Sequence, residues 1–383
     1  MEQAALNALL LFSSPESHNY GNASSVHWAG RRVRGAVDAA RETIARCLQV
    51  DDADSILFTA SATESINTAL KGAFFSKKSP TDNFHLLTSS VEHDATLETM
   101  KFLSELGAKC SILKVNREGE LSLEEFEEKL MARSSREGDF LFVSLLVANN
   151  ETGVVFPYRK AVELAKKYGA MVHLDAVQAP GKLPGFNLKD LDVDLVSFSA
   201  HKIGGPKGVG ALYVKPGTKL SSLLHGGAQE KRRRAGSINV AGVAAFAAAF
   251  ECLPDRDYVR IKKLRDILEQ KIRDAIPGVH FNGGGAAERI VNTSNFVFDG
   301  VRGESLVVGL DLEGFAVSSG SACNSGSILP SHVLLAMGHD KQSAASACRV
   351  SLGPGNTEED VDSFVETLIR TVRRIRDPRT TLA

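Results

Sequence analysis

Cysteine is scarce in this sequence, and its few residues are not arranged in pairs. The 383 residues include five cysteines, with no CxxC motif: Cys47, Cys110, Cys252, Cys323 and Cys348. An odd number of scattered cysteines argues against a disulfide framework, and the missing CxxC pairs argue against a zinc site. A cysteine with a special role in this chain would therefore act as a free thiol.

Excess charge and long apolar runs are also missing. Lys and Arg number 45 against 46 Asp and Glu, a formal net charge of −1, which gives no electrostatic reason to expect nucleic acid or membrane as a partner. No run of about 18 uncharged apolar residues occurs. The start, MEQAALNALLLFSSPESHN, lacks the basic residues and cleavage site of a signal peptide. We therefore expect a cytoplasmic protein.

Short apolar, β-branched runs alternate with helical patterns through most of the chain. Helical patterns at 63–75 and 159–169 separate runs of strand length. The runs lie at 55–60, 85–90, 110–115, 140–148, 171–177, 194–200 and 210–214. This alternation predicts an α/β fold with a mostly parallel sheet that helices cover on both faces.

The chain is too long for one ordinary domain of about 100–200 residues. After LPDRDY the pattern changes to a long, charged amphipathic helix at 258–276. We predict a large α/β domain at 1–253 and a smaller α+β domain at 254–383. The smaller domain would contain strands within 289–298 and 347–353, and a last helix that starts with the capping box of Thr357 and Asp360.

Candidate functional residues follow the predicted strands, where open parallel sheets bind their ligands. Ser61-Ala62-Thr63-Glu64 follows the first run, and it is either a helix cap or an anion-binding turn. His93 follows the second run and has either a structural or a functional role. The polar residues 149–153 follow the fourth run, and alone they indicate only a loop.

The next two runs carry a carboxylate and a lysine. Asp175 lies inside an apolar run, so it needs either an arginine or a protonated ligand group beside it. Lys202 lies at a strand end and is a candidate for a Schiff base. GGPKG resembles part of a phosphate loop, but Lys207 is not followed by Ser or Thr. An anion-binding turn, a buried carboxylate and a strand-end lysine together match the needs of pyridoxal phosphate.

The ordered motifs of this chain resemble those of the cysteine desulfurases, the NifS- and IscS-like group of the class V aminotransferases. The resemblance runs from Tyr20 to Asn356. It is carried by SATES, VEHDATL, NNETGV, HLDAVQAPGKLP, SFSAHKIGGPKGVGALYV, RRAGSINVAG, VSSGSACNSGS, PSHVLLAMG and CRVSLG. It implies a pyridoxal-phosphate-dependent transferase of fold type I, the aspartate aminotransferase-like fold.

The resemblance also implies roles for individual residues. Lys202 would form the Schiff base, Asp175 would pair with the pyridine nitrogen, and His93 would stack on the ring and move protons. Asn150 and Gln178 would address the side of the ring near its phenolic oxygen. The phosphate would be held by small and polar residues: Ala62, Thr63, Ser199, His201 and, in a homodimer, the partner subunit's Ser237, where the family usually has threonine. Arg349 and Asn22 would bind the substrate carboxylate.

Cys323 separates these enzymes from their aminotransferase relatives. Its neighbours at 320–327 are small or polar, whereas a structural cysteine is usually packed among apolar residues. The resemblance implies that L-cysteine becomes L-alanine while Cys323 takes up the sulfur as a persulfide. The sulfur would then pass to an acceptor protein, such as an iron–sulfur scaffold or a tRNA thiolation enzyme.

Two departures from the family pattern concern substrate handling. The usual short first strand with an Asn-Ala-Thr-Thr-like motif is missing, and MEQAALNALLLF is expected to lie within the helix that follows that strand. The family's Gly-Asn-Pro is here Gly21-Asn22-Ala23, which loosens the turn. Two alternatives stay open: an aminotransferase or selenocysteine lyase with the same cofactor, and a non-catalytic scaffold that has kept the fold.

Overall fold

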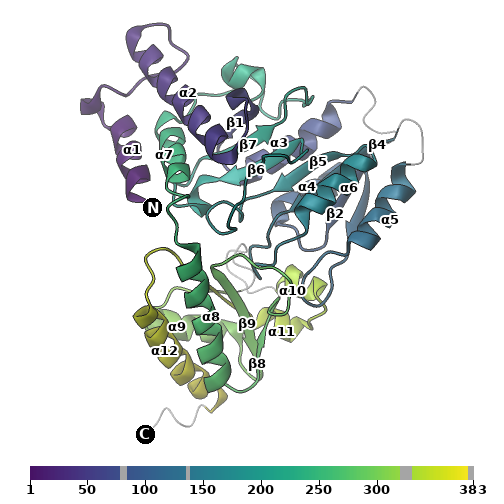
Figure 1. The fold of residues 1–383 in the computed structure, drawn as a ribbon, viewed down its shortest axis with the longest axis vertical. Helices are drawn as coiled ribbons and strands as arrows, with labels where there is room; N and C mark the ends of the chain where they lie inside the picture. Colours follow the sequence, from purple (N-terminus) through teal and green to yellow (C-terminus); the bar gives the residue numbers. More distant parts are fainter. Residues whose placement is uncertain (78–83, 135–138, 320–329, 378–383) are drawn as a thin grey trace. The chain divides into compact units, whose positions relative to one another are not determined.

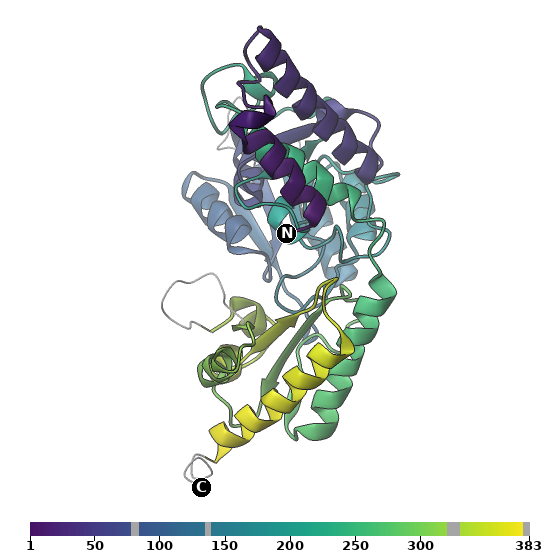
Figure 2. The same ribbon diagram turned by 90° about the vertical axis from the view of Figure 1, so that its left-hand side faces the viewer.

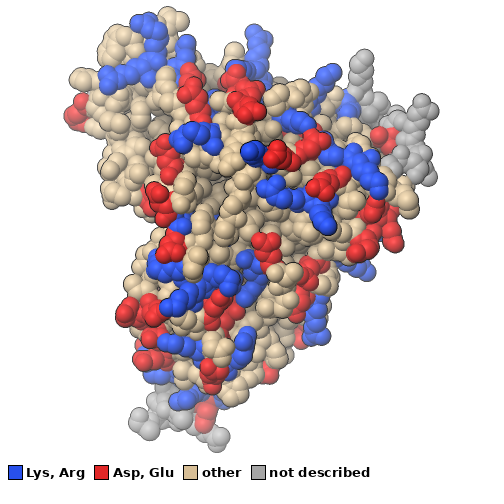
Figure 3. All heavy atoms as spheres, viewed as in Figure 1, with Lys and Arg blue, Asp and Glu red and all other residues tan. Residues whose placement is uncertain are grey.

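The computed structural model describes residues 1–77, 84–134, 139–319 and 330–377. The chain divides into two compact units. Unit 1 consists of residues 1–113, 123–147 and 157–256, and unit 2 of residues 114–122, 148–156 and 257–383. Basic and acidic side chains are interspersed over the face drawn in Figure 3. Among the described residues, no helix is both long and apolar enough to cross a membrane.

Unit 1 is built on a seven-stranded sheet with the strand order β1-β7-β6-β5-β4-β2-β3 (Figure 1). Its strands are β1 (Ile56–Thr59), β2 (Phe84–Ser89), β3 (Lys109–Leu113), β4 (Phe140–Leu146), β5 (Met171–Asp175), β6 (Leu195–Ser199) and β7 (Gly210–Val214). Only β7 runs against its neighbours. The predicted α/β fold with a mostly parallel sheet is confirmed. Its central strands are continuous apolar runs because helices cover both of their faces.

The helices of unit 1 pack on this sheet through apolar side chains. They are α1 (Gln3–Ser13), α2 (Trp28–Leu48), α3 (Ala62–Phe75), α4 (Asp94–Glu105), α5 (Leu123–Ser134), α6 (Tyr158–Lys167) and α7 (Val240–Glu251). Leu195 of β6 joins α3 and α4 in one buried cluster. Phe198 of the same strand instead contacts Phe250 of α7, with ring centroids 6.1 Å apart. The two faces of β6 therefore pack against different helices. Burying a side chain such as Phe198 stabilises the fold by about 1.5–3 kcal/mol.

Unit 2 is an α+β structure on a four-stranded sheet with the order β10-β11-β9-β8. Its strands are β8 (Val279–Phe281), β9 (Thr293–Phe298), β10 (Ser318–Ser319) and β11 (Cys348–Ser351). Its helices are α8 (Tyr258–Ala275), α9 (Gly303–Leu312), α10 (His332–Ala336), α11 (Lys341–Ala345) and α12 (Glu358–Arg376). Helices α8 and α12 lie side by side (Figure 2). The predicted capping box starts α12, with Asp360 N–H donating to Thr357 and Thr357 N–H to Asp360.

The observed division differs from the sequence-based boundary between residues 253 and 254. The main junction lies after Arg256, and the segments 114–122 and 148–156 belong to unit 2 rather than to the first domain. Hydrogen bonds from residues after 256 to these two segments explain the difference. Ile290 N–H donates to the carbonyl of Gly153 over 2.8 Å, and Gly285 N–H donates to the Glu118 carboxylate over 2.8 Å.

Candidate functional site

The strands that precede most candidate residues end at one edge of the large sheet. Strands β1 and β6 are both antiparallel to β7, so they run in the same direction. Strands β5, β4 and β2 are parallel to β6 through successive pairs. The turns after these strands therefore share the carboxyl edge, where α/β proteins bind ligands.

Asp175 is the last residue of β5 and lies at the centre of this edge. It is 7% exposed, and the Val177 N–H donates to its Oδ1 over 3.0 Å. Burial raises the pKa of the Asp175 carboxyl above its ordinary value, while the charges of His93 and Lys202 lower it. The structure thus brings these three residues together, and a further cation beside Asp175 would stabilise its ionised form.

His93 and Lys202 are positioned by short local structures. His93 is the N-cap of α4, and its Nδ1 accepts the Ala95 N–H over 3.0 Å. That hydrogen bond fixes the imidazole ring and leaves Nε2 for another partner. Lys202 ends the 3₁₀ helix Ala200–Lys202 directly after β6, and its side chain is exposed.

A buried neutral histidine lies beneath this edge. His173 of β5 is fully buried between two neighbouring strands, with Nδ1 2.9 Å from Ser144 Oγ and Nε2 2.8 Å from Ser197 Oγ. Burial lowers the pKa of His173 to about 3. The bridge links β4, β5 and β6 two residues before Asp175.

Because of His173, the protein should lose stability in mild acid. In the unfolded chain His173 has a pKa near 6.5 and is protonated in mild acid. In the folded chain its pKa is about 3, so it stays neutral there. Between about pH 7.5 and 5.5 this should cost about 1.4 kcal/mol of unfolding free energy. Urea unfolding at both pH values measures the free energy of unfolding. Its decrease between the two pH values should be larger in the wild type than in His173→Gln by this amount. An equal pH dependence in the two proteins would contradict it.

The turn before α3 has the features of an anion-binding helix start. Ser61 Oγ accepts the Glu64 N–H over 3.1 Å, as the capping pattern predicts. A Cβ on Gly210 would lie only 2.7 Å from the carbonyl carbon of Ser61 and 3.0 Å from the Ala62 nitrogen, so glycine permits this close approach. Ala62 and Thr63 are the first residues of α3, and Thr63 is exposed. Their N–H groups lie where a helix has no internal acceptors.

Cationic side chains gather after β6. Ser199 Oγ lies 2.9 Å from Nδ1 of His201. Burial lowers the pKa of His201, and the positive charges of Lys202, Lys182 and Lys207 lower it further. These lysines therefore lie close enough to His201 to create a positive potential at this edge. The sequence alone indicates a solvated or structural charge at Lys207, and no sequence pattern singles out Lys182.

Three other predicted residues lie in turns and loops of unit 1. Gln178 accepts a hydrogen bond from Lys182, and both follow β5. Asn22 accepts the Ser24 N–H over 2.9 Å, which forms an Asx turn directly after Gly21. Ser237 is exposed in the loop before α7, where a residue offered to a partner subunit would have to lie.

Arg349 and Asn150 belong to unit 2. Arg349 lies on β11, and its Nη1 donates to the carbonyl oxygen of Asn150 over 2.9 Å. The contact fixes the guanidinium beside the turn that carries the Asn150 side chain. Cys323 lies outside the described residues, as do its neighbours at 320–329.

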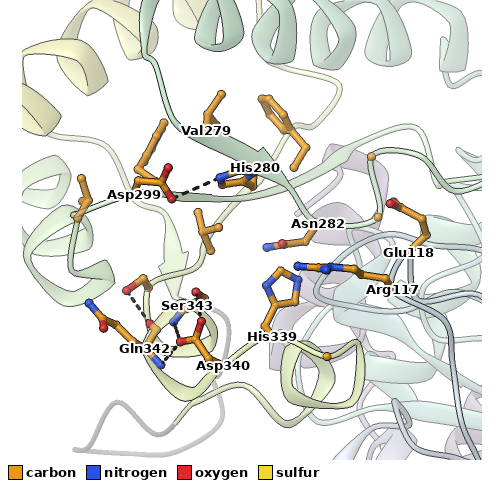
Figure 4. Close-up of a pocket in the computed structure, with 18 of the residues that line it drawn as sticks. Arg117, Glu118, Val279, His280, Asn282, Asp299, His339, Asp340, Gln342 and Ser343 are labelled. Carbon is orange, nitrogen blue, oxygen red and sulfur yellow. Dashed lines mark hydrogen bonds and ion pairs between the residues drawn. The ribbon is translucent and has the colours of Figure 1, made fainter.

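Unit 2 also contains a polar cavity of about 660 Å³ (Figure 4). Nε2 of His280 lies 3.3 Å from Oδ1 of Asp299 at its wall. Asp340 accepts the backbone N–H groups of Gln342 and Ser343. None of the predicted site residues that the structure describes lines this cavity. The cavity is therefore separate from the candidate site.

Sequence reasoning missed a second buried carboxyl group near Asp175. Glu92 accepts the Ser89 hydroxyl over 2.6 Å and the Leu146 N–H over 3.0 Å. Burial is the main reason that the pKa of Glu92 rises to about 8, and Asp175 adds to the rise. The only sequence signal was a glutamate next to His93 at a strand end.

The sequence of this chain matches one known protein family and many of its members. The model of the family "Aminotransferase class-V" matches residues 3–364. A cysteine desulfurase IscS of Dictyoglomus turgidum is 41% identical over 360 residues, which cover 93% of this chain and 89% of that protein. A cysteine desulfurase of a Nostoc species is 40% identical over 360 residues, covering 93% and 87%.

Solved structures give the same result. A NifS-like protein superimposes with a TM-score of 0.87 at 35% identity, covering 97% of this chain and 96% of that one. The structure "SspA in complex with cysteine" matches with a TM-score of 0.78 at 29% identity, covering 93% and 97%. The likeness therefore extends over both units.

Proposed function

This chain belongs to the aminotransferase class-V family, and from this premise we propose that it is a pyridoxal-phosphate-dependent cysteine desulfurase. The proposal rests on one observation above all, the convergence of Asp175, His93 and Lys202 at the carboxyl edge of the large sheet. A buried carboxyl group with a perturbed pKa beside a histidine and a lysine at that edge is typical of a functional site.

The residues of unit 1 fit the chemical groups of pyridoxal phosphate. The start of α3 and the cationic residues around His201 suit a phosphate dianion. Burial raises the pKa of Asp175, so its ionised form needs a cation nearby. A protonated pyridine nitrogen would provide that cation. The exposed amine of Lys202 suits the aldehyde. When bound, the cofactor would withdraw electrons from the α-carbon of an amino acid.

Each residue has a distinct task in this proposal. Asp175 would keep the ring nitrogen protonated, and His93, fixed by the Ala95 N–H, would stack on the ring and move a proton through Nε2. Asn150 and Gln178 would orient the ring from the side of its phenolic oxygen. The phosphate would be held by five residues: Ala62, Thr63, Ser199, His201 and the partner subunit's Ser237. Arg349 and Asn22 would bind the carboxylate of L-cysteine.

Cys323 would accept the sulfur. Its thiolate would attack the substrate sulfur, so that an S–S bond forms while the bond between that sulfur and the substrate β-carbon breaks. The electron pair of the broken bond stays with the carbon fragment, which takes up a proton and leaves as L-alanine. The outcome is one persulfide and one L-alanine for each L-cysteine, with no external oxidant or reductant.

The persulfide would pass to an acceptor protein, such as an iron–sulfur scaffold or a tRNA thiolation enzyme. A homodimer in the cytoplasm suits these tasks, because the partner subunit's Ser237 would complete the phosphate site. A reducing compartment would also keep the Cys323 thiol available between turnovers.

Incubation of the purified protein with L-cysteine tests this function. We expect L-alanine to form, with sulfide released in equal amount when a thiol reductant is present. Without reductant, sulfide should fall far below alanine because sulfur stays on the protein. No alanine from protein reconstituted with pyridoxal phosphate would refute the proposed activity.

A further inference from the structure

A bidentate ion pair joins the first turn of α3 to the loop that carries Ser237. Arg234 Nε and Nη2 donate to the two carboxylate oxygens of Glu64 over 2.8 and 3.2 Å. Both side chains are largely buried, at 18% and 13% exposure. One of these oxygens also accepts the Ala60 N–H over 2.9 Å. The Glu64 carboxylate is thus fixed at the start of α3.

This position creates an electrostatic conflict with the proposed phosphate site. Glu64 is the third residue of α3, where a negative charge is attracted to the helix N-terminus. The phosphate dianion would use the same end of the same helix. Two anions at one helix start repel each other, most strongly where solvent is limited. The site therefore needs a cation that neutralises Glu64.

Arg234 is held in place by a strained but firmly anchored segment. Glu230, Lys231 and Arg232 all have left-handed backbone conformations, with φ of 47°, 56° and 65°. Non-glycine residues adopt the left-handed conformation only where contacts with the surrounding structure stabilise it. The Glu230 carboxylate provides such contacts, since it accepts from Arg41 over 2.9 and 3.1 Å and from the Phe58 N–H over 3.1 Å. Only Arg233 separates this run from Arg234.

We propose that Arg234 is a positioning residue for cofactor binding, which neutralises Glu64 so that the start of α3 can hold the phosphate. The inference rests on the proposed function, because it concerns the phosphate of the same cofactor. The hydrogen bonds that Arg234 donates to Glu64 raise the pKa of Arg234, so the guanidinium keeps its charge. Arg234 acts through Glu64 and needs no contact with the phosphate itself.

A charge-neutralisation series on apoprotein tests this role with two probes, pyridoxal phosphate and inorganic phosphate. Arg234→Gln should weaken the binding of both about tenfold, the equivalent of about 1.4 kcal/mol. The double variant Glu64→Gln/Arg234→Gln should recover affinity to within about threefold of the wild type, because the repelling charge is gone. Glu64→Gln alone should bind at least as tightly as the wild type.

A matched ion pair in the same unit provides the control. Lys166 and Asp194 lie 2.6 Å apart at 23% and 13% exposure, and Asp194 also accepts the Val172 N–H. This pair is at the amino ends of β5 and β6, so Lys166→Gln should leave both affinities unchanged. Dissociation constants come from absorbance titration for the cofactor and calorimetry for phosphate.

The outcomes separate the two proposals. If wild-type apoprotein binds neither probe, the proposed cofactor and with it this inference fail. If the wild type binds but Arg234→Gln binds equally well, or the double variant stays as weak as the single one, the charge role of Arg234 is refuted while the proposed function stands.

Discussion

Replacement of Lys202 by alanine is expected to abolish alanine formation from L-cysteine and to remove the visible absorption band of the bound cofactor. The side chain projects from the 3₁₀ helix after β6, and its charge lowers the pKa of Asp175. We expect a fall in turnover of at least about 10³-fold, since loss of a catalytic nucleophile can cost about 10⁶. Spectra and turnover of purified Lys202→Ala measure both effects.

A second lysine of the same unit gives the control for Lys202. Lys215 follows β7, which runs against β6, so it lies at the opposite edge of the sheet. Its ion pair with Asp192 is exposed, and Lys215→Ala should keep both the absorption band and the turnover. A Lys202→Ala protein that retains the band and forms alanine at the wild-type rate would exclude Lys202 as the Schiff-base lysine.

The large sheet could be predicted because its central strands are buried on both faces. A run such as FLFVSLLVA leaves no polar face, and β4 occupies residues Phe140–Leu146 of it. The same pattern placed Lys202 at a strand end and Asp175 inside the preceding run, and in the structure β5 ends at Asp175. These inferences need only local sequence and the rule that ligands bind at carboxyl edges.

The hydrogen bonds and ion pairs around the site could not be predicted, because they depend on strand register and on contacts between residues far apart in the sequence. His173 is one polar residue in an apolar run, and its partners Ser144 and Ser197 become neighbours only through the order of β4, β5 and β6. Arg234 and Glu64 are 170 residues apart in sequence. No local pattern joins such residues, so their roles emerge only from the folded chain.

Replacement of Cys323 by alanine is expected to stop desulfuration while the cofactor still binds, which separates a desulfurase from an aminotransferase or a selenocysteine lyase. The other four cysteines are poor candidates for the persulfide. Burial raises the pKa of all four thiols, to about 11 for Cys110 and about 12 for Cys348. A thiol with a raised pKa holds little thiolate at neutral pH, and the thiolate is the nucleophile.

Alanine formation by Cys323→Ala should therefore fall by at least about 10³-fold, the effect expected when a nucleophile is lost, with the absorption band of the bound cofactor unchanged. Mass spectrometry after incubation with L-cysteine should find one extra sulfur on the Cys323 peptide of the wild type. Cys252→Ala, which removes a thiol at the C-terminal end of α7, should form the same persulfide at the wild-type rate. Extra sulfur on a peptide other than that of Cys323, or undiminished alanine formation by Cys323→Ala, would assign sulfur transfer to a different group.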